Sequence, residues 1–475
     1  MDLSSVIRSL QRPARLHVDS SDQLSIDVAK AAEKSRARAK HESKSDEDSR
    51  IYMKTPQVVD VPPRLAVSAG DVLRELGVAT TFLTDSPFVP IAQLWAHVRY
   101  CATMEPGRSG LLSLTAHAHK EVVHHHKVAQ SEQIGIGLAL VVARAVMRQQ
   151  HPGCVFQVVD ADVALAAGFI DEVKGRVESR PQTKKRPDYF LIGRRPDAAA
   201  GRSTVYIAVL ECKGTHFARA KVVKQLGDAC LQVQTVSIGR NPLYGLMVGS
   251  SLNKSGITSY VLDPPGSDQL WEGDTDTLDA LIQHEPDEPH WRPGQYEEPP
   301  DADGDGVPGP EAAGREDAEP EEPPAPYAVP PQRKGWLAQV LTRSHAAAVL
   351  LFAGDNATAA HYLTPRQRGH QQGTIPDSEQ WPDYSQRAVK LPGGPRLHGT
   401  TVAMPLPGGQ VLEIFRGMDE RLYRDLAEGK LSTYGRHASR LQRWWRGHQR
   451  RPGDVLSVGA DGTALLMRVR DRRDA

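Results

Sequence analysis

Residues 186–215 read RPDYFLIGRRPDAAAGRSTVYIAVLECKGT, two apolar runs joined by a short loop of glycine, alanine and arginine. Asp188 opens the first run, and Glu211 and Lys213 close the second. Because side chains alternate between the faces of a strand, Glu211 and Lys213 point to the same side. A hairpin between the two runs would return Asp188 to them. The stretch therefore predicts two carboxylates and one amine at one edge of a sheet.

These three side chains suit a divalent-cation site that acts on phosphate esters. Mg²⁺ prefers oxygen ligands and keeps several waters, so Asp188 and Glu211 are sufficient to hold it, and Mn²⁺ accepts the same ligand types. The backbone carbonyl of Cys212 offers a third oxygen. Lys213, next to the cation, can take a proton from water or orient the water. Hydrolysis of a phosphodiester is the reaction that these groups favour.

The flanking sequence predicts an α/β sandwich. An apolar helical repeat follows Ser131, which is placed to cap the helix, and an amphipathic helix follows the second apolar run. The expected order is helix, three strands, helix and strand, with a helical crossover to the last main strand. The predicted elements are a helix from Ser131, strands at 154–159, 188–192 and 205–213, a helix at 216–235, and strands at 244–249 and 258–262.

Pro187-Asp188 followed by Glu211-Cys212-Lys213 resembles the PD-(D/E)xK motif of the restriction-endonuclease-like nuclease superfamily. The resemblance covers about residues 131–263 and implies that superfamily's αβββαβ core and a metal-dependent nuclease activity. It also implies that Glu132, on the first helix, is a further metal ligand, and that Gln225, on the later helix, orients the site. Ala229 stands where one subgroup of the superfamily carries a tyrosine, so that variant is not reproduced.

Composition limits the function classes. The 475 residues carry 58 Lys and Arg against 58 Asp and Glu, so any nucleic-acid footprint must be local. The four cysteines form no C-x-x-C pair and are read as free thiols in a reducing compartment, which favours a cytoplasmic location. We expect no signal peptide, no membrane-spanning helix and no membrane partner. Nucleic acid is the expected partner, with DNA favoured over RNA, and a homodimer is left open.

Shifts in composition divide the chain into five segments. An EF-hand-like run at 301–306 lies in the fourth segment, but Ala312 stands where the loop needs glutamate, so we expect low complexity there. In the fifth segment, residues 346–352 read as a strand. The predicted segments are 1–60, largely disordered; 61–130, a helical extension; 131–283, the nuclease-like core; 284–333, an acidic, proline-rich disordered linker; and 334–475, a separate small α+β domain.

The C-terminal segment contains one dense basic run, YGRHASRLQRWWRGHQRR at 434–451. Such a run can contact phosphates, with Trp444 and Trp445 stacking on bases, or it can be a solvated face over two core tryptophans. Composition alone does not separate these two interpretations. The candidate nucleic-acid contacts are Arg436, Arg440, Arg443, Arg446, Arg450 and Arg451.

A histidine-rich stretch, TAHAHKEVVHHHKVAQ, offers another candidate site. His117, Glu121 and His124 fall on one face if the stretch is a single helix, and that face could hold zinc. The plainer interpretation is a polar helix or loop with incidental histidines.

Two alternatives to an active nuclease remain. A salt bridge between Glu211 and Lys213 would give the motif a structural role only, with Asp188 as a turn residue. Alternatively, the chain is a catalytically inactive nuclease-like module that binds nucleic acid or protein. The near-continuous apolar run at 205–210 argues against the salt-bridge interpretation, because charges at the end of a buried central strand are costly without a cation.

Overall fold

A computed structural model describes most of the chain, and its gaps fall mainly between elements. The described residues are 3–42, 55–82, 89–169, 171–173, 176–178, 185–197, 201–239, 241–263, 266–280, 327–370, 386–390, 396–446 and 455–471. The EF-hand-like run at 301–306 and most of the predicted linker lie outside them.

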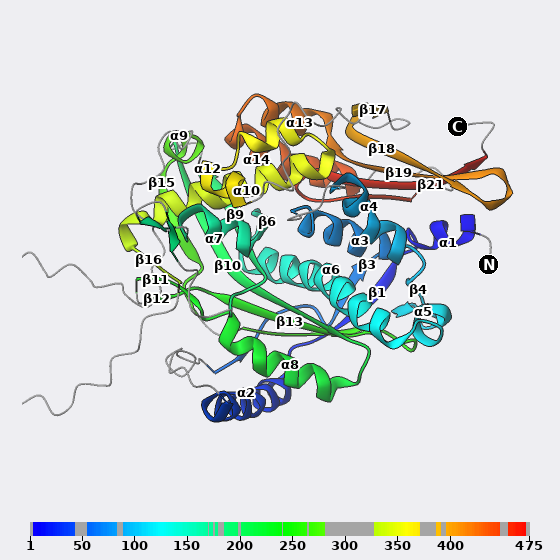
Figure 1. Cartoon of the computed structure of the whole chain (residues 1–475), viewed down its shortest axis with the longest axis horizontal. Coiled ribbons are helices and arrows are strands. Elements are labelled where there is room, and N and C mark those ends of the chain that lie inside the picture. Colours follow the sequence, from blue (N-terminus) through cyan, green and yellow to red (C-terminus); the bar gives the residue numbers. More distant parts are fainter. Residues whose placement is uncertain are drawn as a thin grey trace, which may run out of the picture.

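A nine-stranded mixed sheet forms the centre of the molecule (Figure 1). Its main path runs β3-β1-β14-β13-β10-β9-β6, while β15 pairs with β10 and β2 pairs with β14. The strands are β1 (Ala14–Asp19), β2 (Gln57–Val58), β3 (Arg64–Val67), β6 (Val155–Asp160), β9 (Tyr189–Asp197), β10 (Arg202–Thr215), β13 (Gly245–Ser251), β14 (Thr258–Asp263) and β15 (Gln269–Asp274).

The two apolar runs of the opening stretch form the centre of this sheet. β9 and β10 pair antiparallel from Tyr189–Leu210 to Asp197–Arg202, as the predicted hairpin requires. The crossover through α8 (Arg219–Gln232) then makes β13 parallel to β10. Residues 205–210 are all buried, because helices cover both faces of the strand.

Helices cover the sheet on two sides (Figure 1). On one side α6 (His124–Gln150) and α3 (Ala69–Ala79) pack their apolar faces against even-numbered β10 residues such as Leu210. On the other side α8 and α2 (Asp22–Glu42) pack against odd-numbered residues such as Val209. The result is a mixed α/β fold whose central strands are buried on both faces.

The expected disorder of residues 1–60 is wrong over residues 3–42. That segment forms α1 (Leu3–Ser9), β1 and α2, and β1 lies within the central sheet. α2 needs only a narrow apolar line, with Leu24 and Val28 buried on α8. Small residues let the two helices approach closely, since a Cβ on Gly227 of α8 would lie 2.8 Å from the Ala31 backbone. Because the segment is highly charged, its few apolar positions did not stand out as a buried helix face in the sequence.

The segment 61–130 is only partly helical. Besides α3 it contains β3, which extends the central sheet, and the small antiparallel pair of β4 and β5. α6 begins at His124 rather than near Ser131, which lies within the helix, and Val123 takes the N-cap position. The remaining elements are α4 (Val89–Tyr100), β4 (Met104–Pro106), β5 (Leu112–Leu114) and α5 (Ala116–Lys120).

The end of the predicted linker is ordered. β16 (Tyr327–Val329) is buried and pairs with β11 (Val236–Ile238), which also pairs with β12 (Asn241–Pro242). Through the short apolar run YAV, the chain therefore pairs again with a strand of the α/β fold. The described surroundings also contain α7 (Ala161–Phe169), β7 (Asp171–Val173), β8 (Arg176–Glu178), α9 (Thr275–Asp279) and the 3₁₀ turn η2 (Pro331–Arg333).

Residues 346–352 form part of a helix, not the predicted strand. α10 (Lys334–Ala353) is buried on almost every side, so its last turns show no helical period in the sequence. By length and composition alone, the helical segment Pro331–Ala353 could cross a membrane, since its most apolar window has a mean hydropathy of 1.2, but 83 % of that window is buried inside the molecule. That burial fits a core helix.

The C-terminal region is not the separate domain that the sequence predicts. Its sheet, in the order β17-β18-β19-β21-β20, shares one core cluster with α3 through Ile414, Leu465 and Met467. β20 and β21 pair antiparallel as a hairpin around Asp461-Gly462. The elements are α11 (Asn356–Ala360), α12 (Pro365–His370), β17 (Gln386–Lys390), β18 (Arg396–Leu406), the 3₁₀ turn η3 (Pro407–Gly409), β19 (Gln410–Asp419), α13 (Glu420–Ala427), α14 (Leu431–Arg446), β20 (Val455–Val458) and β21 (Thr463–Asp471).

Candidate active site

Glu211 is the centre of the candidate site and is fully buried. Its Oε2 accepts a hydrogen bond from the backbone nitrogen of Asp188 (3.2 Å), and its Oε1 accepts one from Lys213 Nζ. Asp188 Oδ2 in turn accepts from the backbone nitrogen of Cys212 (2.8 Å). Asp188, Glu211 and Lys213 therefore meet at one strand end, as the opening stretch predicts.

The register of the hairpin explains this meeting. Tyr189 pairs with Leu210, so the residues just beyond that pair, Asp188 and Glu211, lie side by side. Asp188 lies two residues before Phe190 and Glu211 two residues after Val209, so each shares a sheet face with that neighbour. Phe190 and Val209 face α8 and α2. Lys213 follows Glu211 on this face, and its side chain is 23 % exposed. The site thus opens to solvent at Lys213 while Glu211 stays inside.

The electrostatics of the site favour a cation. Burial, followed by the charge of Asp188, raises the pKa of Glu211 to about 8, although Lys213 opposes both effects. Burial also raises the pKa of Asp188, again against the charge of Lys213. Two adjacent buried carboxylates cannot both ionise cheaply, and a bound divalent cation would remove that cost.

Lys213 carries its proton in this arrangement. Burial alone would lower its pKa, but the charges of Glu211 and Asp188 outweigh burial and raise the pKa above the ordinary value. Of the two roles that the sequence suggests for this lysine, orienting water with a charged donor fits better than accepting a proton.

We expect the affinity of the site for Mg²⁺ to increase with pH. Below about pH 8 Glu211 holds a proton that must leave before its carboxylate binds the ion. One proton released per ion makes the apparent dissociation constant fall about tenfold per pH unit up to about pH 8, and level off above it. Calorimetric titration of MgCl₂ at several pH values measures this. Glu211→Gln should flatten the dependence, and a flat wild-type profile would contradict the prediction.

Glu132 lies on the exposed side of α6, next to the same strand end. Two glycines bring the helix there. A Cβ on Gly214 would overlap the Ser131 carbonyl oxygen, and one on Gly135 would lie 2.9 Å from the Gly214 Cα. The charge of Glu132 contributes to the raised pKa of Asp188. Glu132 is therefore electrostatically coupled to Asp188.

Gln225 lies across the same strand end on α8. Its Nε2 donates to the Gly214 carbonyl oxygen at 3.5 Å, a long hydrogen bond. Its Oε1 is buried and finds no hydrogen-bond partner among the described residues. A buried acceptor without a donor is costly, so this oxygen is available for a water or a ligand group.

Asp160 is a carboxylate that the sequence reasoning missed. It ends β6 opposite Tyr189, and the next residue, Ala161, donates its backbone N–H to the Asp188 carbonyl oxygen (3.2 Å). Burial, then the charge of Asp162, raises the pKa of Asp160 to about 7. Its Oδ1 accepts from the first backbone amides of α7, which gives it a structural role. The sequence offered one signal for Asp160, which is that an acidic residue ends an apolar strand.

The described residues contain no group of three or more His, Cys, Asp and Glu side chains placed to hold a metal. The histidine-rich helix of the zinc prediction is broken, since α5 ends at Lys120 and α6 begins at His124. His117 contacts Glu121 (2.5 Å), and both side chains are well exposed. This rules out the single helical face on which the prediction rested. Asp188 and Glu211 are two carboxylates, fewer than such a group requires, whereas Mg²⁺ can be held by one or two carboxylates with waters.

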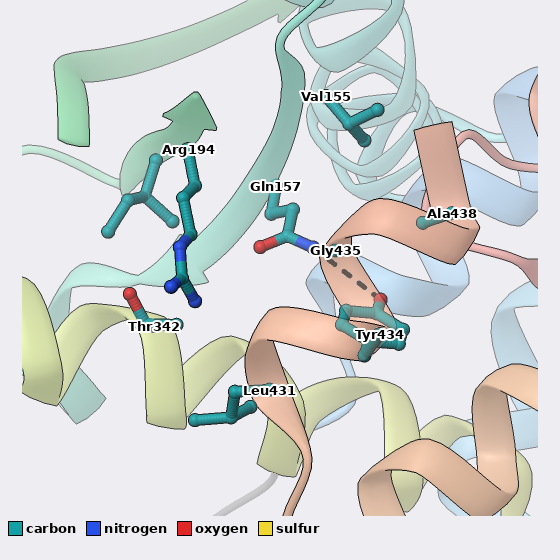
Figure 2. Close-up of a pocket in the computed structure, with 9 residues that line it drawn as sticks. Val155, Gln157, Arg194, Thr342, Leu431, Tyr434, Gly435 and Ala438 are labelled. Carbon is teal, nitrogen blue, oxygen red and sulfur yellow. Dashed lines mark hydrogen bonds between the residues drawn. The ribbon is translucent and has the colours of Figure 1, made fainter. Parts of the chain in front are cut away.

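The basic helix lies away from this site. α14 packs near the opposite end of β6 and β9, where Arg194 donates to Ser432 Oγ (2.7 Å). Gln157 donates to Tyr434 Oη at 3.5 Å in the same place (Figure 2). At about 3.3 Å per residue, Arg194 lies roughly 17 Å along the strand from Tyr189.

Of the candidate basic residues, Arg436 and Arg440 have described side chains, and the structure does not bring these two to the carboxylates. Arg436 and Arg440 are exposed on α14. The side chains of Arg443 and Arg446, and the whole of Arg450 and Arg451, lie outside the described residues, as do the side chains of Trp444 and Trp445.

In comparisons with known proteins, the chain matches no protein-family model, no curated protein and no solved structure.

Proposed function

We propose that this chain is a Mg²⁺-dependent nuclease with a restriction-endonuclease-like core, and that DNA is its first substrate to test. The observation that carries the proposal is the meeting of Asp188, Glu211 and Lys213 at the end of a buried strand. The order of α6, β6, β9, β10, α8 and β13 supports it. A purely structural ion pair accounts less well for a second carboxylate beside the first and for the unpaired oxygen of Gln225.

Asp188 and Glu211 would hold the cation, with Glu132 as a further ligand, and Mn²⁺ could replace Mg²⁺. When bound, the ion would lower the pKa of its water and neutralise charge that develops on the phosphate. These residues suit a divalent cation because they offer oxygen ligands and because the pKa values of both Asp188 and Glu211 are raised. Cys212 adds a backbone carbonyl oxygen to this edge.

Lys213 and Gln225 would position the reacting groups. The side chain of Lys213 is partly exposed while its ammonium contacts Glu211, so the ammonium could also donate to an attacking water or to a phosphate oxygen. The free Oε1 of Gln225 can accept a hydrogen bond from that water and fix its orientation. Both groups act as fixed dipoles or charges and need no proton exchange with solvent.

The proposal is tested by turnover of plasmid and linear DNA with MgCl₂ and with EDTA. We expect cleavage with Mg²⁺ or Mn²⁺ and none above background with EDTA, because the two carboxylates alone cannot activate water. Comparing circular with linear DNA separates endonuclease from exonuclease action. Equal background in both buffers would favour the inactive binding module, and zinc-dependent activity alone would point away from this oxygen-ligand site.

A further inference from the structure

An exposed phenylalanine lies beside the candidate site without apolar cover. Phe217 follows β10 by two residues and is 59 % exposed, although residues of this type are usually buried. Lys127 on α6 and Lys221 on α8 belong to the two elements that meet at this strand end. We name Lys127, Phe217 and Lys221 the strand-end rim.

The backbone of Phe217 is held firmly while its ring is exposed. Its N–H donates to Thr215 Oγ1 (3.2 Å), and its carbonyl oxygen accepts from Ser251 Oγ (2.7 Å). Thr215 and Ser251 are paired residues at the ends of β10 and β13. Two central strands therefore fix the position of an aromatic ring that makes little use of its own apolar surface. A preorganised ring of this kind is suited to stacking.

Two lysines give this edge positive charge. Lys127 lies close enough to His216 for its charge, after burial, to help lower the pKa of that histidine to about 4. Lys221 is exposed and precedes Gln225 by one helical turn, on the face of α8 that meets Gly214. Arg219 is less available, since it forms an ion pair with Asp27 at 2.6 Å. His216 is neutral at pH 7, so the lysines carry the charge.

We propose that the strand-end rim binds an unpaired nucleic-acid strand, with one base stacked on Phe217 and neighbouring phosphates close to Lys127 and Lys221. The choice of a nucleic acid as the occupant rests on the proposed nuclease function. The choice of an unpaired strand rests on the ring, because bases inside a duplex are already stacked and hide their faces. An aromatic platform between cations is the arrangement by which proteins hold single strands.

The test is binding of a fluorescein-labelled thymidine oligonucleotide, and of a duplex of equal length, to the full chain in EDTA, measured by fluorescence anisotropy. Phe217→Ala should weaken single-strand binding about tenfold or more and change duplex binding by less than about twofold. Phe217→Trp should retain the affinity. Lys127→Ala and Lys221→Ala should each reduce the slope of log affinity against log salt by about 0.7.

The matched control is Val58→Ala. Val58 is also an exposed apolar residue (42 %), but it pairs with Leu262 at the other end of β14. Unchanged single-strand affinity in Phe217→Ala would overturn the inference, as would an equal loss for both DNA forms or no single-strand binding by wild type. Because EDTA prevents turnover, this result is separate from nuclease activity. A chain that never cleaves can still show the Phe217 effect, and a chain that cleaves can lack it.

Discussion

Replacing Lys213 with alanine should slow Mg²⁺-dependent DNA cleavage by about 10²- to 10³-fold, the range for loss of one positioned hydrogen-bond donor. The side chain of Lys213 contacts buried Glu211 and is itself partly exposed. In the variant Glu211 can stay protonated and neutral at pH 7, since its pKa is already about 8 and Lys213 only lowers it. The fold should therefore survive, which a thermal melt recorded beside the initial rates would verify.

Two further variants make the Lys213 result specific. Lys430 also pairs with a carboxylate, Glu428, but both side chains are more than half exposed, and Lys430→Ala should cleave like wild type. Lys213→Arg keeps the charge on a longer, planar group and should recover only part of the rate. If Lys213→Ala and wild type cleave equally fast with Mg²⁺, Lys213 has no part in the reaction. If both show only the EDTA background, the nuclease proposal itself fails.

The site was predictable because its signals are local. Asp188, Glu211 and Lys213 lie within one hairpin, where the period of two and the turn fix which side chains meet. The burial of Glu211 also follows from the apolar run that precedes it. Glu132 was predicted as a site residue only from the family resemblance, because its position depends on how α6 crosses β10. The glycines that allow this crossing, Gly135 and Gly214, are visible in the sequence, but their pairing is not.

The parts that sequence reasoning got wrong depend on distant partners. β1 belongs to the central sheet because it pairs with β14, about 240 residues later in the chain, and nothing local in ARLHVD specifies that partner. Residues 346–352 of α10 looked like a strand because a helix buried all round shows no polar stripe. The C-terminal sheet looked separate because its apolar residues could serve either a core of their own or the shared core with α3. Tertiary packing decided each case.

A buried ionic network joins the C-terminal hairpin to this body, and Asp461 is its terminal carboxylate. Asp461 is fully buried, and its Oδ2 lies 3.2 Å from Arg144 of α6. Arg144 also pairs with Glu75 (3.1 Å), which pairs with Arg74 (2.7 Å). Burial opposes ionisation of Asp461, but Arg144 and then Arg74 outweigh it and hold its pKa well below the usual range. The network thus fixes the helix that carries Glu132.

Replacing Asp461 with alanine should lower the free energy of unfolding by about 3–5 kcal/mol, because two buried arginines would then share a single carboxylate. The hairpin would also lose the acceptor for the backbone N–H of Thr463 (3.1 Å) and for its hydroxyl (2.6 Å). Urea unfolding of the full chain at pH 7, followed by circular dichroism, measures the change. Since the pKa of Asp461 is lowered on folding, its contribution is present at neutral pH and fades as the pH falls below about 4.

Asp461→Asn separates charge from shape, because it keeps an acceptor for Thr463 while it removes the charge that balances the arginines. It should lose most of the stability that the alanine variant loses, since unpaired buried cations dominate the cost. Asp471, the exposed last residue of β21, provides the matched control, and Asp471→Ala should change stability by less than about 0.5 kcal/mol. A similarly small change in Asp461→Ala would mean that the hairpin folds independently of α6. The C-terminal region would then be the separate domain that the sequence suggested.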